Sequence, residues 1–271
     1  VNGRNFEYVS GGDPYLGKTM VAPVVEGVQG QGIIANAKHW VNNNQETNRQ
    51  TVNEVVDEKT RYELYYPPFE GAVDAGVGSF MCSYNKINSL WSCENQDTLK
   101  GDLKDTLGFQ GWVMSDWEAT HSVSINAGLD QEMPGKQYFG AKLKDAVDKG
   151  EVDMASVDES VLRILTPMYE MGVMDRGIDS GDDDDVKLAL DVTSEAHNKL
   201  AAYLSAKSHV LLKNDREALP LHTETGRNLK IAVIGQMARE PIIGGGGSGA
   251  VYPKTVSSPY TGLMEALGMK E

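Results

Sequence analysis

Short apolar runs alternate with longer amphipathic segments through the first 175 residues of the chain. The apolar runs predict strands over residues 33–37, 78–84, 111–116 and 127–133. Apolar positions at helical spacing predict helices over residues 15–29, 57–75, 98–107, 142–149 and 157–171. Because strands that alternate with helices are typical of parallel βα units, the pattern predicts an α/β fold.

Start and stop signals accompany several of these helices. Pro14 opens the first helix, Pro67 and Pro68 interrupt the second, and Gly108 ends the third. In the helix over 157–171, Ser156 and Glu159 have the spacing of a capping box. The apolar residues of that helix fall on one face, which we expect to be buried: Val157, Val161, Ile164, Leu165 and Met168.

Polar or reactive side chains stand where the four predicted strands end, at Lys38, Tyr84, Asp116 and near Glu132. In a (β/α)8 barrel the strand ends meet at one face, where active sites are built, and a closed barrel needs eight strands. We therefore expect residues 1–174 to form the C-terminal half of a TIM-type barrel, with the first half absent from this sequence.

The character of the chain changes over residues 175–192, where glycines are followed by four consecutive aspartates at 182–185. This composition predicts an exposed acidic linker; a calcium loop is the alternative, but the alternating ligands and closing glutamate are absent. Residues 193–271 begin a second domain, with a predicted helix from Thr193, strands over 209–212 and 230–235, and a helix starting at Pro259.

Composition and charge exclude several classes of function. The chain has 271 residues, of which 40% are hydrophobic and 24% charged, as in ordinary globular proteins. Its formal net charge of −14 would repel a phosphate backbone, so we expect no nucleic-acid partner. The apolar runs are too short to cross a bilayer. The chain begins at Val1 and not at methionine, so the lack of a visible signal peptide says nothing about secretion.

The two cysteines, Cys82 and Cys93, could form a disulfide across a short loop or remain free thiols. No zinc-binding spacing is present, and we expect neither a metal nor a cofactor. The glycine-rich loop at 244–249 suggests dinucleotide binding, but eight residues with a proline among them separate it from the preceding predicted strand. A loop that approaches a ligand closely, or a plain loop, fits these glycines better.

The stretch 111–117, with sequence GWVMSDW, is the strongest candidate for chemistry. Asp116 follows four residues of strand character and is itself followed by Trp117. A carboxylate walled by an aromatic ring at a strand end suits a sugar-cleaving site, although an aspartate there could also cap the next helix. Lys38 and His39 lie at another strand end, where they could bind sugar hydroxyls and keep a nearby aspartate ionised. The alternative is a lysine on the surface and a histidine that is satisfied by packing.

Eight segments in this order resemble glycoside hydrolase family 3, in its β-glucosidase branch. They are GRNFEY at 3–8, DPYL at 13–16, AKHW at 37–40, NNQETNR at 43–49, MCSYN at 81–85, GFQGWVMSDW at 108–117, EMPG at 132–135 and VLLKN at 210–214. The resemblance covers nearly the whole chain. It implies a (β/α) barrel followed by an α/β sandwich, with the active site between them.

The resemblance also implies residue roles. Asp116 matches the nucleophile of retaining enzymes in the family. Residues that match glycone-binding positions are Arg4, Lys38 and His39, and those that match pocket-lining positions are Met81, Tyr84 and Trp117. Tyr84 is expected to reach the nucleophile as well.

A retaining glycosidase needs a second carboxyl about 5–5.5 Å from the nucleophile to protonate the leaving oxygen. In the family this acid/base glutamate lies in a later segment, which this chain does not contain. Glu7, Glu46 and Glu118 could reach the site, but no motif places them there. We therefore expect this 271-residue chain to be inactive by itself.

The expected activity of the complete protein is exo-hydrolysis of terminal β-D-glucosyl residues from β-glucosides or oligosaccharides. The alternatives are a β-xylosidase or another exo-β-glycosidase of the family, or a non-catalytic sugar-binding relative. The family resemblance suggests a secreted protein.

Overall fold

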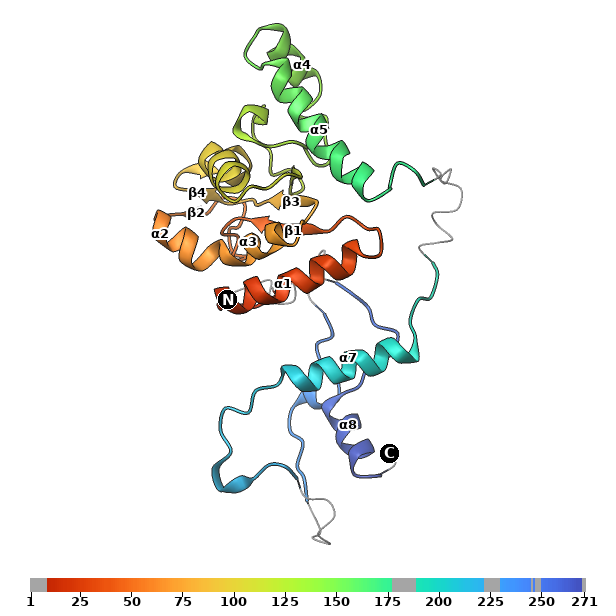
Figure 1. Cartoon of the computed structure of the whole chain (residues 1–271). Helices are drawn as coiled ribbons and strands as arrows, with labels where there is room; N and C mark the ends of the chain where they lie inside the picture. Colours follow the sequence, from red (N-terminus) through yellow and green to blue (C-terminus); the bar gives the residue numbers. More distant parts are fainter. Residues whose placement is uncertain (1–8, 177–188, 222–229, 245, 247–249, 270–271) are drawn as a thin grey trace. The chain divides into compact units, whose positions relative to one another are not determined.

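The computed structural model of the chain describes residues 9–176, 189–221, 230–244, 246 and 250–269 (Figure 1). The chain divides into two compact units, residues 1–178 and 179–271. The predicted acidic linker falls largely outside the described residues, as does most of the glycine-rich loop. Among the described helices, none is both long enough and apolar enough to cross a membrane.

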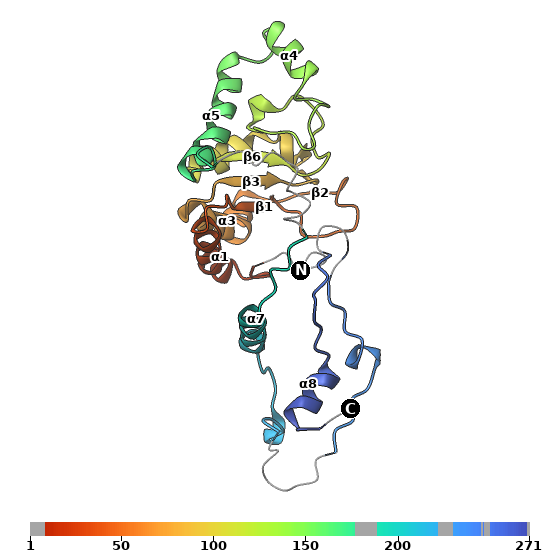
Figure 2. The ribbon, with the colours of Figure 1, turned by 90° about the vertical axis from the view of Figure 1, so that its right-hand side faces the viewer.

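The first unit is built on a three-stranded parallel sheet in the order β1-β3-β6 (Figure 2). These strands are β1 (Asn36–Trp40), β3 (Ser79–Cys82) and β6 (Trp112–Ser115). In their register Met81 pairs with both Lys38 and Met114. The sequence thus predicted three strands of one parallel sheet, each within a few residues of its observed bounds.

The strand predicted over 127–133 is wrong in its extent. Its first residue belongs to the 3-10 turn η5 (Ile125–Ala127), and only Gln131 bridges to the sheet, in parallel with Met114. Gly128 follows the turn with φ +107°, a left-handed conformation that interrupts an extended strand. The carbonyl of Val113 accepts hydrogen bonds from the amides of both Asp130 and Gln131, so a short bent segment replaces a regular ladder.

A second small sheet, in the order β2-β4-β5, lies beyond the ends of these strands and was not predicted. Its strands are β2 (Asn53–Glu54), β4 (Lys86–Ile87) and β5 (Leu90–Trp91), and β4 and β5 form an antiparallel hairpin. Two-residue strands are too short to show the alternation of apolar and polar residues by which strands are predicted.

Helix α1 (Pro14–Gln29) packs against α3 (Pro67–Asp74) beside the sheet (Figure 1). Asp13 caps α1 by accepting a hydrogen bond from the Leu16 amide at 2.9 Å. The predicted helix over 57–75 is divided, as expected, in front of its two prolines: α2 (Glu58–Thr60) and the π-helix η2 (Arg61–Tyr65) precede α3. A Cβ on Gly71 would lie 2.5 Å from the Lys18 carbonyl oxygen, so only glycine permits this close packing.

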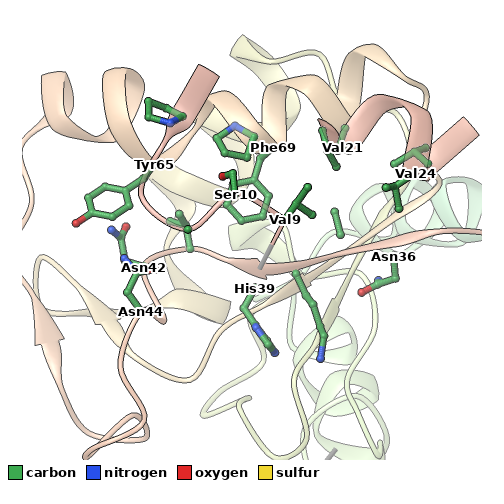
Figure 3. A pocket seen from close by; sticks show the side chains of 18 of the residues that line it. Val9, Ser10, Val21, Val24, Asn36, His39, Asn42, Asn44, Tyr65 and Phe69 are labelled. Carbon is green, nitrogen blue, oxygen red and sulfur yellow. The ribbon is translucent and has the colours of Figure 1, made fainter. Parts of the chain in front are cut away.

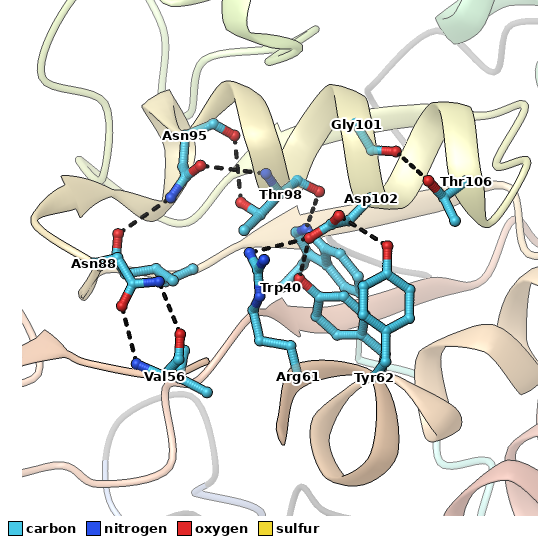
Figure 4. A network of polar contacts seen from close by, with 12 residues as sticks. Trp40, Val56, Arg61, Tyr62, Asn88, Asn95, Thr98, Gly101, Asp102 and Thr106 are labelled. Carbon is cyan, nitrogen blue, oxygen red and sulfur yellow. Dashed lines mark hydrogen bonds and ion pairs between the residues drawn. The ribbon is translucent and has the colours of Figure 1, made fainter. Parts of the chain in front are cut away.

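The helix predicted over 98–107 is the π-helix η4 (Asp97–Thr106), and one of its carboxylates ties it to η2 (Figure 4). Asp102 accepts hydrogen bonds from the hydroxyls of Tyr62 at 2.9 Å and Tyr66 at 2.6 Å. Arg61 lies 3.1 Å from the same carboxylate. Burial, together with the hydrogen bond to Asp102, raises the pKa of Tyr66, so this phenol remains a donor.

Aromatic rings fill the core between the sheet and these helices. Trp40 stacks on Tyr66 with ring centroids 4.6 Å apart and meets the edge of Phe80 at 5.8 Å. Its indole nitrogen donates to the Thr98 carbonyl at 3.0 Å, which satisfies its only polar atom (Figure 4). The indole therefore fixes the end of β1 against both η2 and η4.

Helices α4 (Ala141–Asp148) and α5 (Met154–Glu170) end the first unit. The predicted capping box of α5 is wrong, because the helix begins three residues earlier and Asp153 caps it through the Ala155 amide. The predicted apolar face is also only partly buried, since Val161 is 47% exposed. Ser160 is buried instead, because its hydroxyl donates to the interior carboxylate of Asp130 and so sets the rotation of the helix.

The second unit contains α7 (Glu195–Ser208) and α8 (Pro259–Ala266), capped by Ser194 and Ser258, as well as the 3-10 turns η7 (Asp215–Glu217) and η8 (Gln236–Ala238). Both helices were predicted. The strands predicted over 209–212 and 230–235 are wrong for the described residues, which form no ladder there. Val210 is 78% and Leu212 is 91% exposed, so these apolar runs lack the neighbouring strand that would pair with them. The α/β sandwich stays a prediction.

Candidate active site

Three parallel strands bring three of the predicted site residues to one edge of the sheet. In the register of the sheet, Trp40 at the end of β1 pairs with Cys82 at the end of β3, which pairs with Ser115 at the end of β6. His39, Tyr84 and Asp116 therefore start from adjacent strand ends. Their side chains are almost fully buried, with residue exposures of 8%, 8% and 7%.

Polar groups from all three strand ends surround the Asp116 carboxylate. Its Oδ1 accepts hydrogen bonds from the Tyr84 hydroxyl at 3.1 Å and from the Trp117 amide at 2.8 Å. Its Oδ2 lies 3.2 Å from Nε2 of His39. The backbone amide of Asp116 donates to the Cys82 carbonyl at 3.1 Å, so main chain and side chain are both fixed.

Burial by itself would raise the pKa of the Asp116 carboxyl, because it disfavours the charged form. The hydrogen bond and the electrostatic attraction of His39 oppose it, together with the Trp117 amide and the Tyr84 hydroxyl, and the net result is a lowered pKa. Asp116 is thus a buried carboxylate that is ionised near neutral pH. A helix-capping role, the alternative from sequence, does not account for these partners.

The segment 130–133 anchors the strand that ends on Asp116. The Ser115 amide donates to the Gln131 carbonyl at 2.9 Å, and the Met133 amide donates to the Ser115 hydroxyl at 2.8 Å. Asp130 accepts from the Val113 amide at 2.8 Å and from Nζ of Lys104 at 2.8 Å on each oxygen. This buried ion pair therefore fixes β6 two residues before its end.

The other predicted residues differ in their placement. Met81 lies on β3 between Lys38 and Met114, whereas Lys38 is exposed on β1 next to His39. Trp117 directly follows Asp116, the candidate nucleophile, and is 57% exposed. Arg4 lies outside the described residues, and so does Glu7.

Cys82 and Cys93 form a disulfide with a Cα–Cα distance of 5.3 Å, which resolves the alternative left open by the sequence. Both residues are fully buried. The bridge joins the end of β3 to the 3-10 turn η3 (Ser92–Glu94), directly beside the segment that carries Tyr84.

Sequence reasoning missed the contact that Arg49 makes with Tyr84. The guanidinium carbon of Arg49 lies 4.7 Å from the centre of the Tyr84 ring, and the Glu46 carboxylate lies 3.3 Å from the same guanidinium. A cation over an aromatic face is an attractive arrangement. Arg49 ends the segment 43–49 that carries part of the family resemblance, and this was the only signal that pointed to it. Glu46, one of the acid/base candidates, is therefore paired with Arg49.

A cavity of about 760 Å³ lies along β1 between α1 and α3 (Figure 3). Lys38 and His39 line it, but most of its lining is apolar and contains neither Asp116 nor Tyr84. Figure 3 shows the His39 ring pointing away from Val21 and Val24 of α1. The Asp116 carboxylate is not part of the lining of this cavity. Within the described ranges, no group of three or more His, Cys, Asp or Glu side chains could hold a metal ion.

Family models and curated proteins match most of the chain. The family model for the glycosyl hydrolase family 3 N-terminal domain matches residues 2–167, and the model for the C-terminal domain of that family matches residues 209–270. A β-glucosidase of Rhizobium radiobacter is 42% identical over 271 residues, covering 98% of this chain and 32% of its own length. The β-glucosidase cel3A of Pyricularia oryzae is 39% identical over 241 residues, covering 86% and 32%.

Solved structures give the same result. The β-D-glucoside glucohydrolase of Trichoderma reesei aligns with a TM-score of 0.79 at 36% identity, over 98% of this chain and 40% of that protein. β-Glucosidase 3B of Thermotoga neapolitana in complex with glucose aligns with a TM-score of 0.82 at 36% identity, over 99% and 37%. The chain spans about a third of the length of the curated relatives above. It belongs to glycosyl hydrolase family 3.

Proposed function

We propose that the whole protein is a retaining exo-β-glycosidase that releases terminal β-D-glucosyl residues, with Asp116 as its nucleophile. The observation that carries the proposal is the buried carboxylate of Asp116, which hydrogen bonds and a facing imidazole keep ionised at the ends of three parallel strands. The names of the relatives support glucose as the released sugar, since those proteins are called β-glucosidases.

The reaction follows from the charge of this carboxylate. An oxygen of Asp116 attacks the anomeric carbon while the bond from that carbon to the leaving oxygen breaks through an oxocarbenium-like transition state. A covalent glycosyl-enzyme ester results, and water hydrolyses it to release the sugar and regenerate the carboxylate. Tyr84 and the Trp117 amide fix the plane of the carboxylate by binding Oδ1, so the nucleophile needs little reorientation before attack.

His39 has two roles in this proposal. Its Nε2 lies close enough to Asp116 to stabilise the ionised form, and by family resemblance His39, Lys38 and Arg4 hold the glycone hydroxyls. Met81 and Trp117 would line the site. The leaving oxygen takes its proton from a second carboxyl of raised pKa, which the family supplies from a later segment.

The disulfide supports a secreted protein. Buried disulfides form and persist in oxidising compartments and are rare in the reducing cytosol. Cys82 and Cys93 are bridged and fully buried next to the site. We therefore propose that the protein acts outside the cytosol on β-glucosides or oligosaccharides.

A mechanism-based trap tests the proposal. The whole protein is incubated with an activated 2-deoxy-2-fluoro-β-glucoside, which slows hydrolysis of the ester, and the labelled peptide is identified by mass spectrometry. We expect the label on Asp116, and Asp116→Asn should lose both labelling and turnover. A label on a different carboxylate would refute the assignment. A panel of aryl glycosides identifies the sugar that the enzyme releases most readily. Faster turnover of the xyloside than of the glucoside would indicate a β-xylosidase.

A further inference from the structure

The exposed indole of Trp117 is carried on a tight turn, residues 116–119, which we call the Trp117 turn. The Ala119 amide donates to the Asp116 carbonyl at 3.1 Å, which closes the turn, and Glu118 occupies its third position with φ +63°. A positive φ at that position is typical of type II turns, where glycine or asparagine is usual. A glutamate in this conformation is strained, so neighbouring contacts must hold the turn.

Hydrogen bonds from two backbone amides hold the turn and the segment that follows it. The Glu118 amide donates to the Met133 carbonyl at 2.9 Å, and the His121 amide donates to Oε1 of Glu94 at 3.0 Å. The second bond reaches η3, which belongs to the loop after β3 and not to the strand that carries Asp116. The loops that follow β3 and β6 are therefore joined by this hydrogen bond, two residues after the end of the Trp117 turn.

An aromatic pair reinforces this connection. The rings of Trp91 and His121 are stacked, with centroids 4.0 Å apart and an interplanar angle of 18°. Nζ of Lys86, which faces Trp91 across the β4–β5 hairpin, lies 4.4 Å from the centre of the Trp91 ring. Partial desolvation of the ring lowers the pKa of His121, so a neutral imidazole stacks beside the lysine ammonium without repulsion.

The residues that follow Trp91 are held by buried contacts. The next residue, Ser92, is fully buried and donates from its hydroxyl to the Trp40 carbonyl at 2.6 Å. Cys93 follows and is bridged to Cys82 at the end of β3. The position of the Trp91 ring is thus tied to the ends of β1 and β3, which also carry His39 and Tyr84.

Exposure divides the site into two parts. The groups around the Asp116 carboxylate, His39 and Tyr84, are buried and polar, and suit the hydroxyls of an enclosed sugar. Trp117 directly follows Asp116 and is more than half exposed, so its indole offers an apolar face to solvent. In the proposed reaction the leaving group is the part of the substrate that extends towards solvent, so an exposed aromatic side chain next to Asp116 can contact it.

We propose that Trp91, His121 and Glu94 form a clamp that positions the Trp117 turn and thereby sets the selectivity of the enzyme for its leaving group. The clamp residues are positioning residues, since they act through Trp117. The inference rests on the proposed glycosidase function. It predicts that loss of the clamp weakens the binding of large aromatic leaving groups while the enclosed sugar is bound as before.

The test compares two substrates in the whole protein: an aryl β-glucoside, and β-glucosyl fluoride, whose leaving group is too small to contact an indole. Trp91→Leu should raise KM for the aryl glucoside about tenfold, the fold-change that corresponds to loss of one aromatic pair. It should leave kcat/KM for the fluoride unchanged. Trp91→Tyr keeps an aromatic face for His121 and should recover most of the loss. Leu90→Ala, at an exposed neighbour on β5, is the matched control.

Equal losses of kcat/KM on both substrates would mean that Trp91 has only a structural role. An unchanged KM for the aryl glucoside would mean that the clamp does not position Trp117. Either result overturns the inference. If Trp91→Leu does not fold, His121→Ala breaks the same stack from an exposed position and is expected to give the same split.

A wild-type protein that hydrolyses neither substrate would instead refute the proposed function. Hydrogen exchange then tests the clamp independently of activity. The amides of Glu118 and His121 should exchange faster in Trp91→Leu, and unchanged exchange would overturn the clamp.

Discussion

The buried ion pair between Lys104 and Asp130 holds the strand that ends on Asp116, and Asp130→Asn tests how much that strand depends on it. The Asp130 carboxylate accepts from Nζ of Lys104 on both oxygens, from the Ser160 hydroxyl at 2.9 Å and from the Val113 amide at 2.8 Å. An asparagine has the same shape, but it keeps one acceptor oxygen and turns an amino group towards the lysine.

The magnitude follows from burial. The side chains of Lys104 and Asp130 are 5% and 2% exposed, so the variant leaves an ammonium in the interior without its counter-charge. Removing one partner of a buried pair costs about 3–5 kcal/mol of unfolding free energy. Lys104→Met combined with Asp130→Asn removes the unpaired charge, so the double variant should be more stable than Asp130→Asn alone. Urea denaturation, followed through tryptophan fluorescence, measures all three.

The pH dependence of the stability lost in Asp130→Asn gives a second test. Burial lowers the pKa of Lys104 below that of an unfolded lysine, although Asp130 opposes the shift. The unfolded state then binds more protons between the two pKa values, so stability rises with pH across that interval. Without Asp130 the pKa of Lys104 falls further. The difference in unfolding free energy between the wild type and Asp130→Asn should therefore become smaller as the pH approaches 10.5, the ordinary lysine value. A difference that widens with pH, or a double variant less stable than Asp130→Asn, would refute this reasoning.

Three further predictions concern the same site. Tyr84→Phe removes a donor to ionised Asp116 and so raises the pKa of that carboxyl; the acidic limb of the kcat/KM profile should move to higher pH, and an unmoved limb would contradict the role of the hydroxyl. Replacing Cys82 and Cys93 by alanines opens an 11-residue loop and should cost about 3 kcal/mol in urea denaturation, whereas unchanged stability would show that the bridge contributes nothing. Gly111→Ala would place a Cβ 2.0 Å from the backbone oxygen that precedes β3 and should cost about 1–3 kcal/mol or more; a variant as stable as wild type would argue against this strand register.

The convergence of His39, Tyr84 and Asp116 could be predicted from sequence because the carboxyl ends of parallel strands meet at one edge. Finding three strands was enough to bring these residues together, even though their bounds were shifted by a few residues. The rotation of α5 could not be predicted in the same way. The apolar periodicity predicted that the face through Val161 is buried. In the structure Ser160 is buried instead, where its hydroxyl binds Asp130.

The contacts that sequence reasoning missed are those between irregular segments. Arg49 reaches the Tyr84 ring from a loop, and Trp91 meets His121 from a two-residue strand. Neither pair follows from a period of 2 or 3.6, since each depends on how two loops fold over each other. The strands expected in the second unit failed for another reason, because an apolar run predicts a strand only where a partner strand lies beside it.

The anchors of Asp116 differ in kind, and this difference bears on its chemistry. Those that act on its backbone, through Cys82, and on the neighbouring residues, through the segment 130–133, determine where the carboxylate lies. Those that act on its oxygens, from His39 and Tyr84, determine its charge. A variant of the first group should lower stability and turnover together, whereas a variant of the second group should shift the pH dependence while the fold persists. Comparing Asp130→Asn with Tyr84→Phe in both assays therefore separates the position of the nucleophile from its ionisation.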